Sequence, residues 1–207
     1  MKASVWNRLV LGGTIGILLF VATATIIIDP FLHYHSPLAG LEYPLLDERY
    51  QNDGMARHFS YDALITGTSM TQNFKPSEFD ELWGTESIKI AFSGGSYKEI
   101  DENVRRVLKY NDHVRYVLRS LDSGMLNQPA EYNAYEGYPY YLFDSNPFND
   151  VQYLLNKEVV PKTLAVINYT RAGNRTPDRD EYGSWSQYMV FGREQVFSYY
   201  RDLGEFE

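Results

Sequence analysis

An uninterrupted apolar run near the N-terminus constrains this chain more than any other feature. Residues 9–28 (LVLGGTIGILLFVATATIII) contain no charged side chain. At about 1.5 Å of rise per residue, a helix over this run is roughly 30 Å long, the thickness of the hydrocarbon core of a bilayer. Lys2 and Arg8 precede the run and Asp29 follows it. The positive-inside bias therefore predicts that residues 1–8 lie in the cytoplasm and the rest of the chain outside.

Two other interpretations of this run are a buried core helix and a cleaved signal peptide. A helix that is apolar on every face suits lipid better than the core of a soluble domain. Ala22-Thr-Ala24 resembles a signal-peptidase site, but cleavage there would leave the apolar sequence TIII as a new terminus. We therefore expect an uncleaved single-pass anchor in the cell membrane, with lipid as its partner.

The composition of the chain excludes several classes of protein. Its 207 residues include 27 Asp and Glu against 19 Lys and Arg, a formal charge of −8. We expect no nucleic-acid partner, because phosphate binding requires clustered basic side chains. The chain has no cysteine, which excludes disulfides, thiolate metal sites and cysteine nucleophiles. His33-x-His35 could bind a metal, but no acidic cluster lies nearby, so the sequence predicts neither a metal nor an organic cofactor.

Composition divides the chain into four segments. Residues 1–8 form the cytoplasmic N-terminus, 9–28 the anchor, 29–60 a connecting segment and 61–207 an extracytoplasmic domain. Prolines and glycines interrupt residues 29–60, which show no sustained hydrophobic period. Such a pattern is typical of an extended connection.

Strand and helix signals alternate after this connection. Short apolar runs indicate strands, whereas Pro76 at a helix start and the capping box Ser96-x-x-Glu99 indicate helices. The predicted segments are strands at 62–67, 87–92 and 114–122 and helices at 76–83 and 97–110. Because a crossover helix returns each strand in the same direction, the strands should pair in parallel. The predicted fold class is a three-layer α/β domain around a parallel sheet.

The C-terminal third of the chain is less regular. Helical patterns occur at 149–156, 159–172 and 192–202. Residues 131–141 contain five tyrosines, whose flat rings and hydroxyls suit sugar recognition. Tyr135 and Tyr138 are accordingly weak candidates for substrate contacts. The competing interpretation, which the sequence favours, is that these rings cover the sheet and pack on the helices that follow.

Polar loops follow all three predicted strands, and parallel strands bring their carboxyl ends to one edge of the sheet, where ligands bind. The loops are 67–71, 93–96 and 122–124. A serine directly after a buried strand, such as Ser69, can present its hydroxyl there as a nucleophile. Gly94 and Gly95 would let backbone N–H groups approach a developing oxyanion. The alternative role of these hydroxyls is to satisfy backbone groups of the loop.

The segments ITGTSMTQNFKPSEFDELWG and IKIAFSGGSYKEIDENV resemble the membrane-anchored branch of the SGNH (GDSL-type) hydrolase superfamily. Bacterial proteins of D-alanyl-lipoteichoic acid biosynthesis and of polysaccharide O-acyl transfer belong to this branch. The resemblance runs from about residue 43 onward and is strongest over 61–122. It implies a flavodoxin-like fold, Ser69 of Gly67-Thr-Ser69 as the nucleophile, and Gly94 or Gly95 as an oxyanion donor.

The sequence departs from the family pattern in two places. The family places an oxyanion-hole Asn at a third strand end, where this chain has Asp122, with Asn127 five residues further on. An ionised Asp122 would repel an oxyanion. The Asp-x-x-His segment, which supplies the general base, does not occur. We therefore expect a C-terminally truncated family member, whose sheet and catalytic base are incomplete in this fragment.

Two functions follow as expectations. The first is a serine esterase or O-acyltransferase that acts on cell-envelope polysaccharide. The second is a non-catalytic, membrane-tethered scaffold or carbohydrate-binding module that works with other envelope-assembly proteins. Phosphate binding at residues 93–96 is a third possibility, although nucleotide hydrolysis is not expected without a Gly-Lys-Ser/Thr motif.

Overall fold

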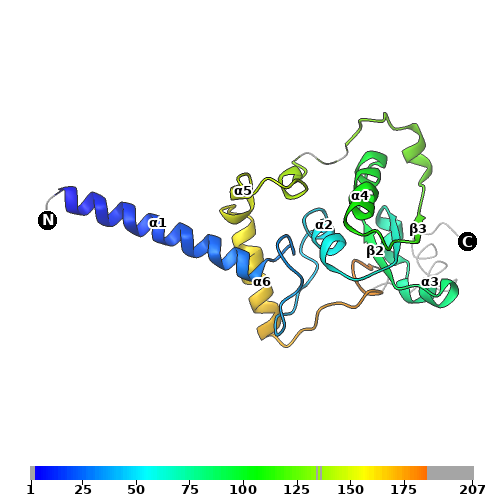
Figure 1. The fold of residues 1–207 in the computed structure, drawn as a ribbon, viewed down its shortest axis with the longest axis horizontal. Helices are drawn as coiled ribbons and strands as arrows, with labels where there is room; N and C mark the ends of the chain where they lie inside the picture. The colour runs from blue at the N-terminus through cyan, green and yellow to red at the C-terminus, as the bar shows by residue number, and fades with distance from the viewer. Residues whose placement is uncertain (1–2, 134, 136, 186–207) are drawn as a thin grey trace, which may run out of the picture.

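The computed structural model describes residues 3–133, 135 and 137–185 of the chain. Its order along the chain is a long N-terminal helix, a mixed α/β region and two further helices (Figure 1). The elements are α1 (Ala3–Ile28), α2 (Glu48–His58), β1 (Ala63–Gly67), η1 (Ser69–Asn73), α3 (Pro76–Trp83), β2 (Ser87–Ala91), α4 (Tyr97–Tyr110), β3 (Tyr116–Arg119), η2 (Ser123–Asn127), η3 (Tyr140–Leu142), α5 (Val151–Leu154) and α6 (Val159–Arg171).

A three-stranded parallel sheet in the order β2-β1-β3 confirms the predicted strand pairing. β1 and β2 are buried at every position, whereas the side chains of β3 are largely exposed. The crossover from β1 to β2 passes through α3, and the crossover from β2 to β3 passes through α4. Because the two crossovers move in opposite directions from β1, their right-handed paths place α3 and α4 on opposite faces of the sheet.

Local signals explain where the two crossover helices begin and end. Pro76 is the first residue of α3, and Gly84 ends that helix in the left-handed conformation. Ser96 caps α4 by accepting the Glu99 N–H at 3.2 Å. Both helices therefore span the residues that the sequence predicts.

The main core lies between the sheet and the helices α2 and α4. Leu64, Ile88 and Ile90 point from the strands toward Ile100 and Val107 of α4, and all five are buried. The opposite face of the sheet carries Ile65 and Leu118, which alternate with the core residues along their strands.

The predicted extended connection over 29–60 is wrong, because the segment contains α2. This helix buries seven of its 11 residues, most of them polar, against α4 and β2. Its sequence, ERYQNDGMARH, lacks the apolar period on which the prediction relied. Hydrogen bonds and ion pairs replace apolar packing there. Residues 29–60 thus belong to the α/β region.

The N-terminal helix α1 leaves its apolar surface uncovered, with only 6% of its most apolar window buried. It is long and apolar enough to span a membrane and is not a core helix of the described fold. The predicted helices over 149–156 and 159–172 correspond to α5 and α6, which contact the C-terminal part of α1. The helix predicted over 192–202 lies outside the described residues.

A buried carboxylate joins α1 to the rest of the chain. Asp29 directly follows α1 and accepts the N–H groups of His33, Tyr34 and His35 at 2.7–3.1 Å. The Tyr153 hydroxyl of α5 also donates to Asp29, at 2.7 Å. We call Asp29, residues 33–35 and Tyr153 the Asp29 cluster. It folds the chain back on α1, leaving no extended linker after the helix.

Candidate functional site at the carboxyl edge of the sheet

The loop after the central strand β1 places Ser69 at the predicted edge. A Cβ at Gly67 would meet the hydroxyl oxygens of Ser120 and Thr71 at 2.0 and 2.2 Å, so only glycine fits there. The chain then turns into η1, whose first residue is the half-buried Ser69. The Ser69 carbonyl accepts the indole N–H of Trp185 at 2.9 Å. The nucleophile candidate is thus accessible from the carboxyl edge.

Two side chains of α2 hold the loop that follows β2. The Ser93 N–H donates to the Glu48 carboxylate, and the Ser93 carbonyl accepts Arg49 Nη2 at 2.8 Å. The other Glu48 oxygen accepts the Gln72 amide of η1 at 2.5 Å. Glu48 therefore links the loop after β1 to the loop after β2, and both backbone groups of Ser93 are fixed from below.

The two glycines of this loop differ in their N–H groups. Gly95 donates its N–H to the Phe92 carbonyl at 2.9 Å, so that group is used within the turn. Gly94 is exposed and has φ +62°, a conformation that favours glycine. Of the two predicted oxyanion donors, Gly94 is the one that the turn leaves toward solvent.

A buried ion pair supports the same loop. Arg49 Nε lies 2.8 Å from one oxygen of Glu99, and Arg49 Nη2 donates to the other at 3.3 Å. Burial raises the pKa of the Glu99 carboxyl, while Arg49 and the Ser96 N-cap turn oppose that shift. Burial likewise raises the pKa of Glu48, against the bonds from Ser93 and Gln72. Two carboxyls of raised pKa thus flank Arg49 beneath the edge.

The loop after β3 approaches β1 through Asp122. The Thr68 hydroxyl donates to the Asp122 carboxylate, beside Ser69. The order β2-β1-β3 makes the β1/β3 boundary the point where the chain reverses its direction across the sheet, and ligands bind at such points. Asn127, the other candidate from this loop, is exposed at the end of η2. Asp122, rather than Asn127, is therefore joined to the Ser69 loop.

The two tyrosines of the predicted substrate loop occupy different environments. Tyr135 is exposed, and the Arg49 guanidinium lies 4.5 Å from the centre of its ring. Tyr138 is only 7% exposed and packs on Tyr140 and Phe143. Burial raises the pKa of Tyr138. Tyr138 therefore belongs to the packing, whereas Tyr135 borders the site through Arg49.

The four histidines of the sequence make their contacts elsewhere. His33 lies 3.6 Å from Asp150, and His35 contacts the backbone of Ser36 and Ile26. His58 contacts the carbonyl of His33. His113 is exposed beside Asp112, before β3. Within the described residues, the groups that approach Ser69 are therefore Thr68, Asp122 and Trp185 rather than an imidazole.

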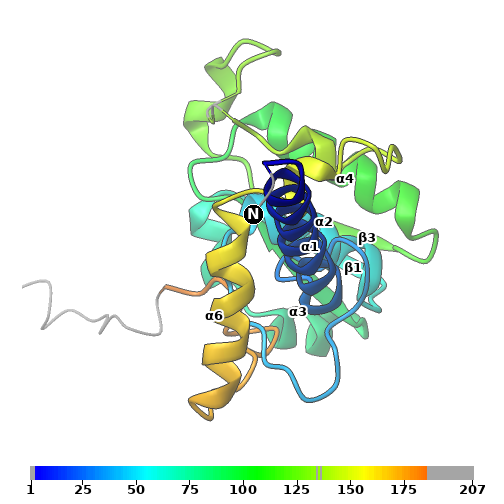
Figure 2. The same ribbon diagram turned by 90° about the vertical axis from the view of Figure 1, so that its left-hand side faces the viewer.

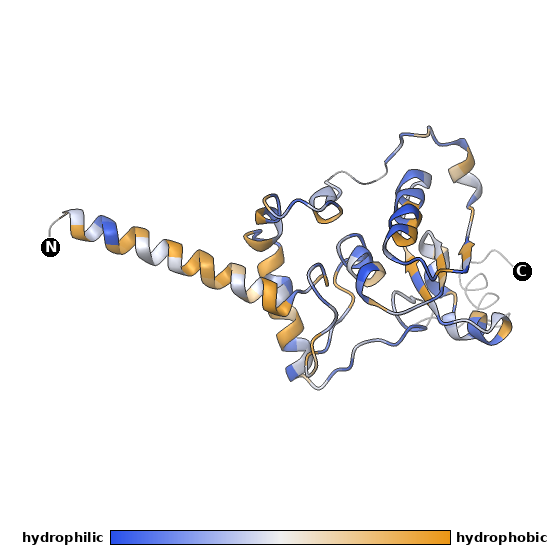
Figure 3. Ribbon diagram, in the orientation of Figure 1, coloured by the Kyte–Doolittle hydropathy of each residue, from blue (hydrophilic) through white to orange (hydrophobic). Residues whose placement is uncertain are grey.

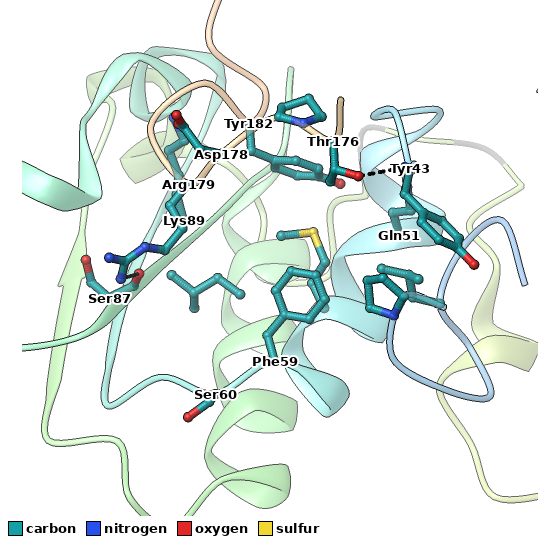
Figure 4. A pocket seen from close by; sticks show the side chains of 15 residues that line it. Tyr43, Gln51, Phe59, Ser60, Ser87, Lys89, Thr176, Asp178, Arg179 and Tyr182 are labelled. Carbon is teal, nitrogen blue, oxygen red and sulfur yellow. Dashed lines mark hydrogen bonds between the residues drawn. The ribbon is translucent and has the colours of Figure 1, made fainter. Parts of the chain in front are cut away.

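An apolar cavity of about 70 Å³ lies away from this edge, between α2, the first half of β2 and residues 176–182 (Figure 4). Met55, Phe59 and Ile88 are among its apolar lining residues. At its border the Lys89 amine donates to the carbonyls of Gln72, Phe74 and Asp180 at 2.5–3.0 Å. Burial lowers the pKa of Lys89 to about 8. Lys89 thus joins three backbone segments beside the cavity.

The sequence did not point to Glu48 and Arg49, although one signal for them existed. Asp47 caps α2 by accepting the Arg49 N–H at 2.9 Å, and an Asp followed by Glu is a common helix start. That signal predicts a helix but not that its polar face contacts the sheet edge. Comparisons of the chain with protein-family profiles, with curated proteins and with solved structures gave no match.

Proposed function

We propose that this chain is a membrane-anchored, extracytoplasmic serine esterase or O-acyltransferase of the SGNH type that acts on cell-envelope polysaccharide. The observation that carries the proposal is the placement of Ser69. It lies at the carboxyl end of the central strand, half-buried, beside a Gly-Gly turn fixed by α2. The strand order β2-β1-β3 supports a flavodoxin-like fold, since it matches the first three strands of that order.

In this proposal Ser69 Oγ attacks the carbonyl carbon of an acyl ester and forms an acyl-enzyme. A general base accepts the Ser69 proton and returns it to the departing alcohol. The Gly94 N–H, with the N–H of Ser69, stabilises the negative charge on the carbonyl oxygen. Water or a sugar hydroxyl then takes the acyl group. The base is a group other than the four histidines of this sequence, given their contacts elsewhere.

The proposed location follows from α1. Its exposed apolar surface fits lipid, and Lys2 and Arg8 place the N-terminus in the cytoplasm. Residues 29–207 are then extracytoplasmic, on a single-pass anchor. Retention of the anchor is supported by the burial of Thr25, just after the Ala22-Thr-Ala24 sequence, because cleavage there would expose this packed part of α1.

Labelling with a serine-reactive fluorophosphonate tests the nucleophile. In the full-length chain in detergent or lipid, Ser69→Ala should abolish labelling. The matched control is Ser123→Ala, which removes an exposed hydroxyl from the loop after β3 at the same edge. Equal labelling of the Ser69→Ala and unaltered chains would remove Ser69 from the mechanism.

A second candidate function is supported by two aromatic rings beside Ser69. Tyr135 stacks on Arg49, and Trp185 donates to the Ser69 carbonyl. Such rings suit sugar binding without catalysis. If polysaccharide binding is weakened by Tyr135→Ala but unchanged by Ser69→Ala, and no fluorophosphonate reacts, a carbohydrate-binding module describes the chain better than an esterase.

A further inference from the structure

Two helices of the C-terminal half lie against the base of α1. Figure 2, which looks along α1 from its N-terminal side, shows α6 lying across the near face of the domain. Both α5 and α6 contact the last turns of α1. In Figure 3 the apolar colour of α1 continues into α6 where the two helices meet. We call residues 148–171, which include α5 and α6, the shoulder.

The contact covers one face of α1 and begins at a definite residue. Every side chain from residue 3 to residue 20 is exposed. From Val21 onward one face is covered, with Val21 and Ala24 half-buried and Thr25 buried. On the shoulder, Val159 and Val166 are buried in the same region. The shoulder thus packs beside residues 21–28 of the apolar run.

The length of the uncovered part of α1 constrains how deep the shoulder must lie. Residues 9–20 form about 18 Å of helix, whereas the hydrocarbon core of a bilayer is roughly 30 Å thick. Extending the span toward the N-terminus would bring the charged Arg8 into the core. If α1 spans the bilayer, residues 21–28 supply the remaining 12 Å or so. The shoulder, which contacts these residues, then reaches the same depth.

The free surface of the shoulder suits that position. Phe148 is 88% exposed, Leu164 54% and Val151 52%. Leu164 lies between the half-buried Val160 and Ile167 on α6, an apolar stripe with helical spacing. Helices that lie in the membrane interface bury such a stripe about 5–10 Å into the boundary between headgroups and acyl chains.

We propose that the shoulder is a monotopic membrane-binding element that lies in the outer interface of the bilayer beside α1, with lipid as its occupant. Phe148, Val151 and Leu164 contact the acyl-chain boundary. The inference rests on the membrane anchoring proposed above and does not involve the chemistry at Ser69.

Single-cysteine labelling of the full chain tests this inference, because the native sequence has no cysteine. An environment-sensitive NBD dye is attached at Leu164→Cys or Val151→Cys, with Ile15→Cys as the anchor reference and Leu82→Cys as the control. Leu82 is an exposed apolar residue of α3, away from the shoulder. The chains are reconstituted into vesicles of phosphatidylcholine and phosphatidylglycerol that contain a nitroxide-labelled lipid.

We expect the Leu164 and Val151 labels to be blue-shifted and partly quenched by the nitroxide lipid, whereas the Leu82 label resembles a dye in water. If the shoulder labels match Leu82 while the Ile15 label reports lipid, the shoulder inference is wrong and the anchor stands. Shoulder labels that are shielded from water but not quenched by lipid would replace lipid with a second copy of the chain. An Ile15 label in water would overturn the proposed anchor itself.

Discussion

Two buried carboxylates hold different regions of this molecule together in different ways. Asp29 accepts hydrogen bonds from neutral donors, three backbone N–H groups and the Tyr153 hydroxyl. Glu99 is paired with the Arg49 guanidinium, which also holds the exposed loop at Ser93 and stacks on Tyr135. The Asp29 cluster is closed within the fold, whereas the Arg49 pair connects the core to the surface at the candidate site.

The difference separates a purely structural cluster from one that also positions a site. Losing the Asp29 cluster should lower the stability of the fold but leave the folded Ser69 edge unchanged. Losing Arg49 should lower stability and also free the Ser93–Gly94 turn. Stability and fluorophosphonate labelling of Ser69, measured on the same variants, therefore test the comparison.

The largest effect is expected for Arg49→Met, which leaves Glu99 buried without its cation. Removing one partner of a buried ion pair costs about 3–5 kcal/mol. Because burial raises the pKa of Glu99, protonation near about pH 4 should reduce this loss. Chemical denaturation at both pH values measures the effect. Arg105→Met, on the exposed side of α4, is the control and should change stability by less than about 0.5 kcal/mol.

The same variant tests the positioning role of Arg49. A double variant, Arg49→Met with Glu99→Leu, should recover most of the stability, since no unpaired charge stays buried. Its Ser69 labelling should still be slower than that of the unaltered chain, because the Ser93 carbonyl has lost its donor. Full recovery of labelling in the double variant would restrict Arg49 to a structural role.

Asp29→Ala should cost about 2–4 kcal/mol, because the Tyr153 hydroxyl and three N–H groups lose their acceptor. Asp29→Asn should cost less, since it keeps one acceptor oxygen and tolerates the positive φ of 47° at this position. Urea denaturation gives the difference, and Asp112→Ala, at an exposed position, is the control. Labelling of Ser69 in the folded fraction should not change. A fall in that rate would join the two regions that we separate.

A smaller effect is expected at Lys89, whose pKa burial lowers to about 8. The unfolded chain, with an ordinary lysine pKa, then binds more protons than the folded chain between about pH 8 and 10.5, so stability increases as the pH rises through this window. The stability of the unaltered chain relative to Lys89→Met should rise by about 2 kcal/mol from pH 7 to about pH 9.5. Lys75→Met, at an exposed position nearby, is the matched control. A constant difference would contradict the lowered pKa.

The smallest change in stability is expected for Gly94→Ala, about 1 kcal/mol, because the backbone at φ +62° disfavours a side chain. Its effect on Ser69 labelling should be larger, since strain in the turn displaces the proposed oxyanion donor. Gly137→Ala, at φ +84° in a loop outside the Ser93–Gly94 turn, controls for the backbone cost alone. Equal labelling by both variants would argue against Gly94 in the site.

The elements that the sequence predicts well are those with local signals. Pro76, Gly84 and the Ser96-x-x-Glu99 box define α3 and α4, and the apolar runs define β1 and β2. These signals act within a few residues, so the sequence alone contains them. The strand pairing also follows, because the crossovers are short and their handedness is fixed.

What the sequence could not provide depends on contacts between distant residues. α2 is buried through Arg49, Asn52 and Asp53, whose partners lie 39 to 53 residues further along the chain. An apolar period cannot reveal a helix that is buried by polar contacts. The same reason explains why Glu48 and Arg49 were missed as supports of the Ser93 loop, and why Tyr138 could not be separated from Tyr135.

The direct passage of α1 into the Asp29 cluster limits the movement of the domain relative to its anchor. In a bilayer the two would rotate together about the membrane normal and diffuse laterally as one body. The Ser69 edge would then stay at a nearly constant height above the lipid surface. A polymeric target would have to be presented at that height, because the domain could not bend toward it.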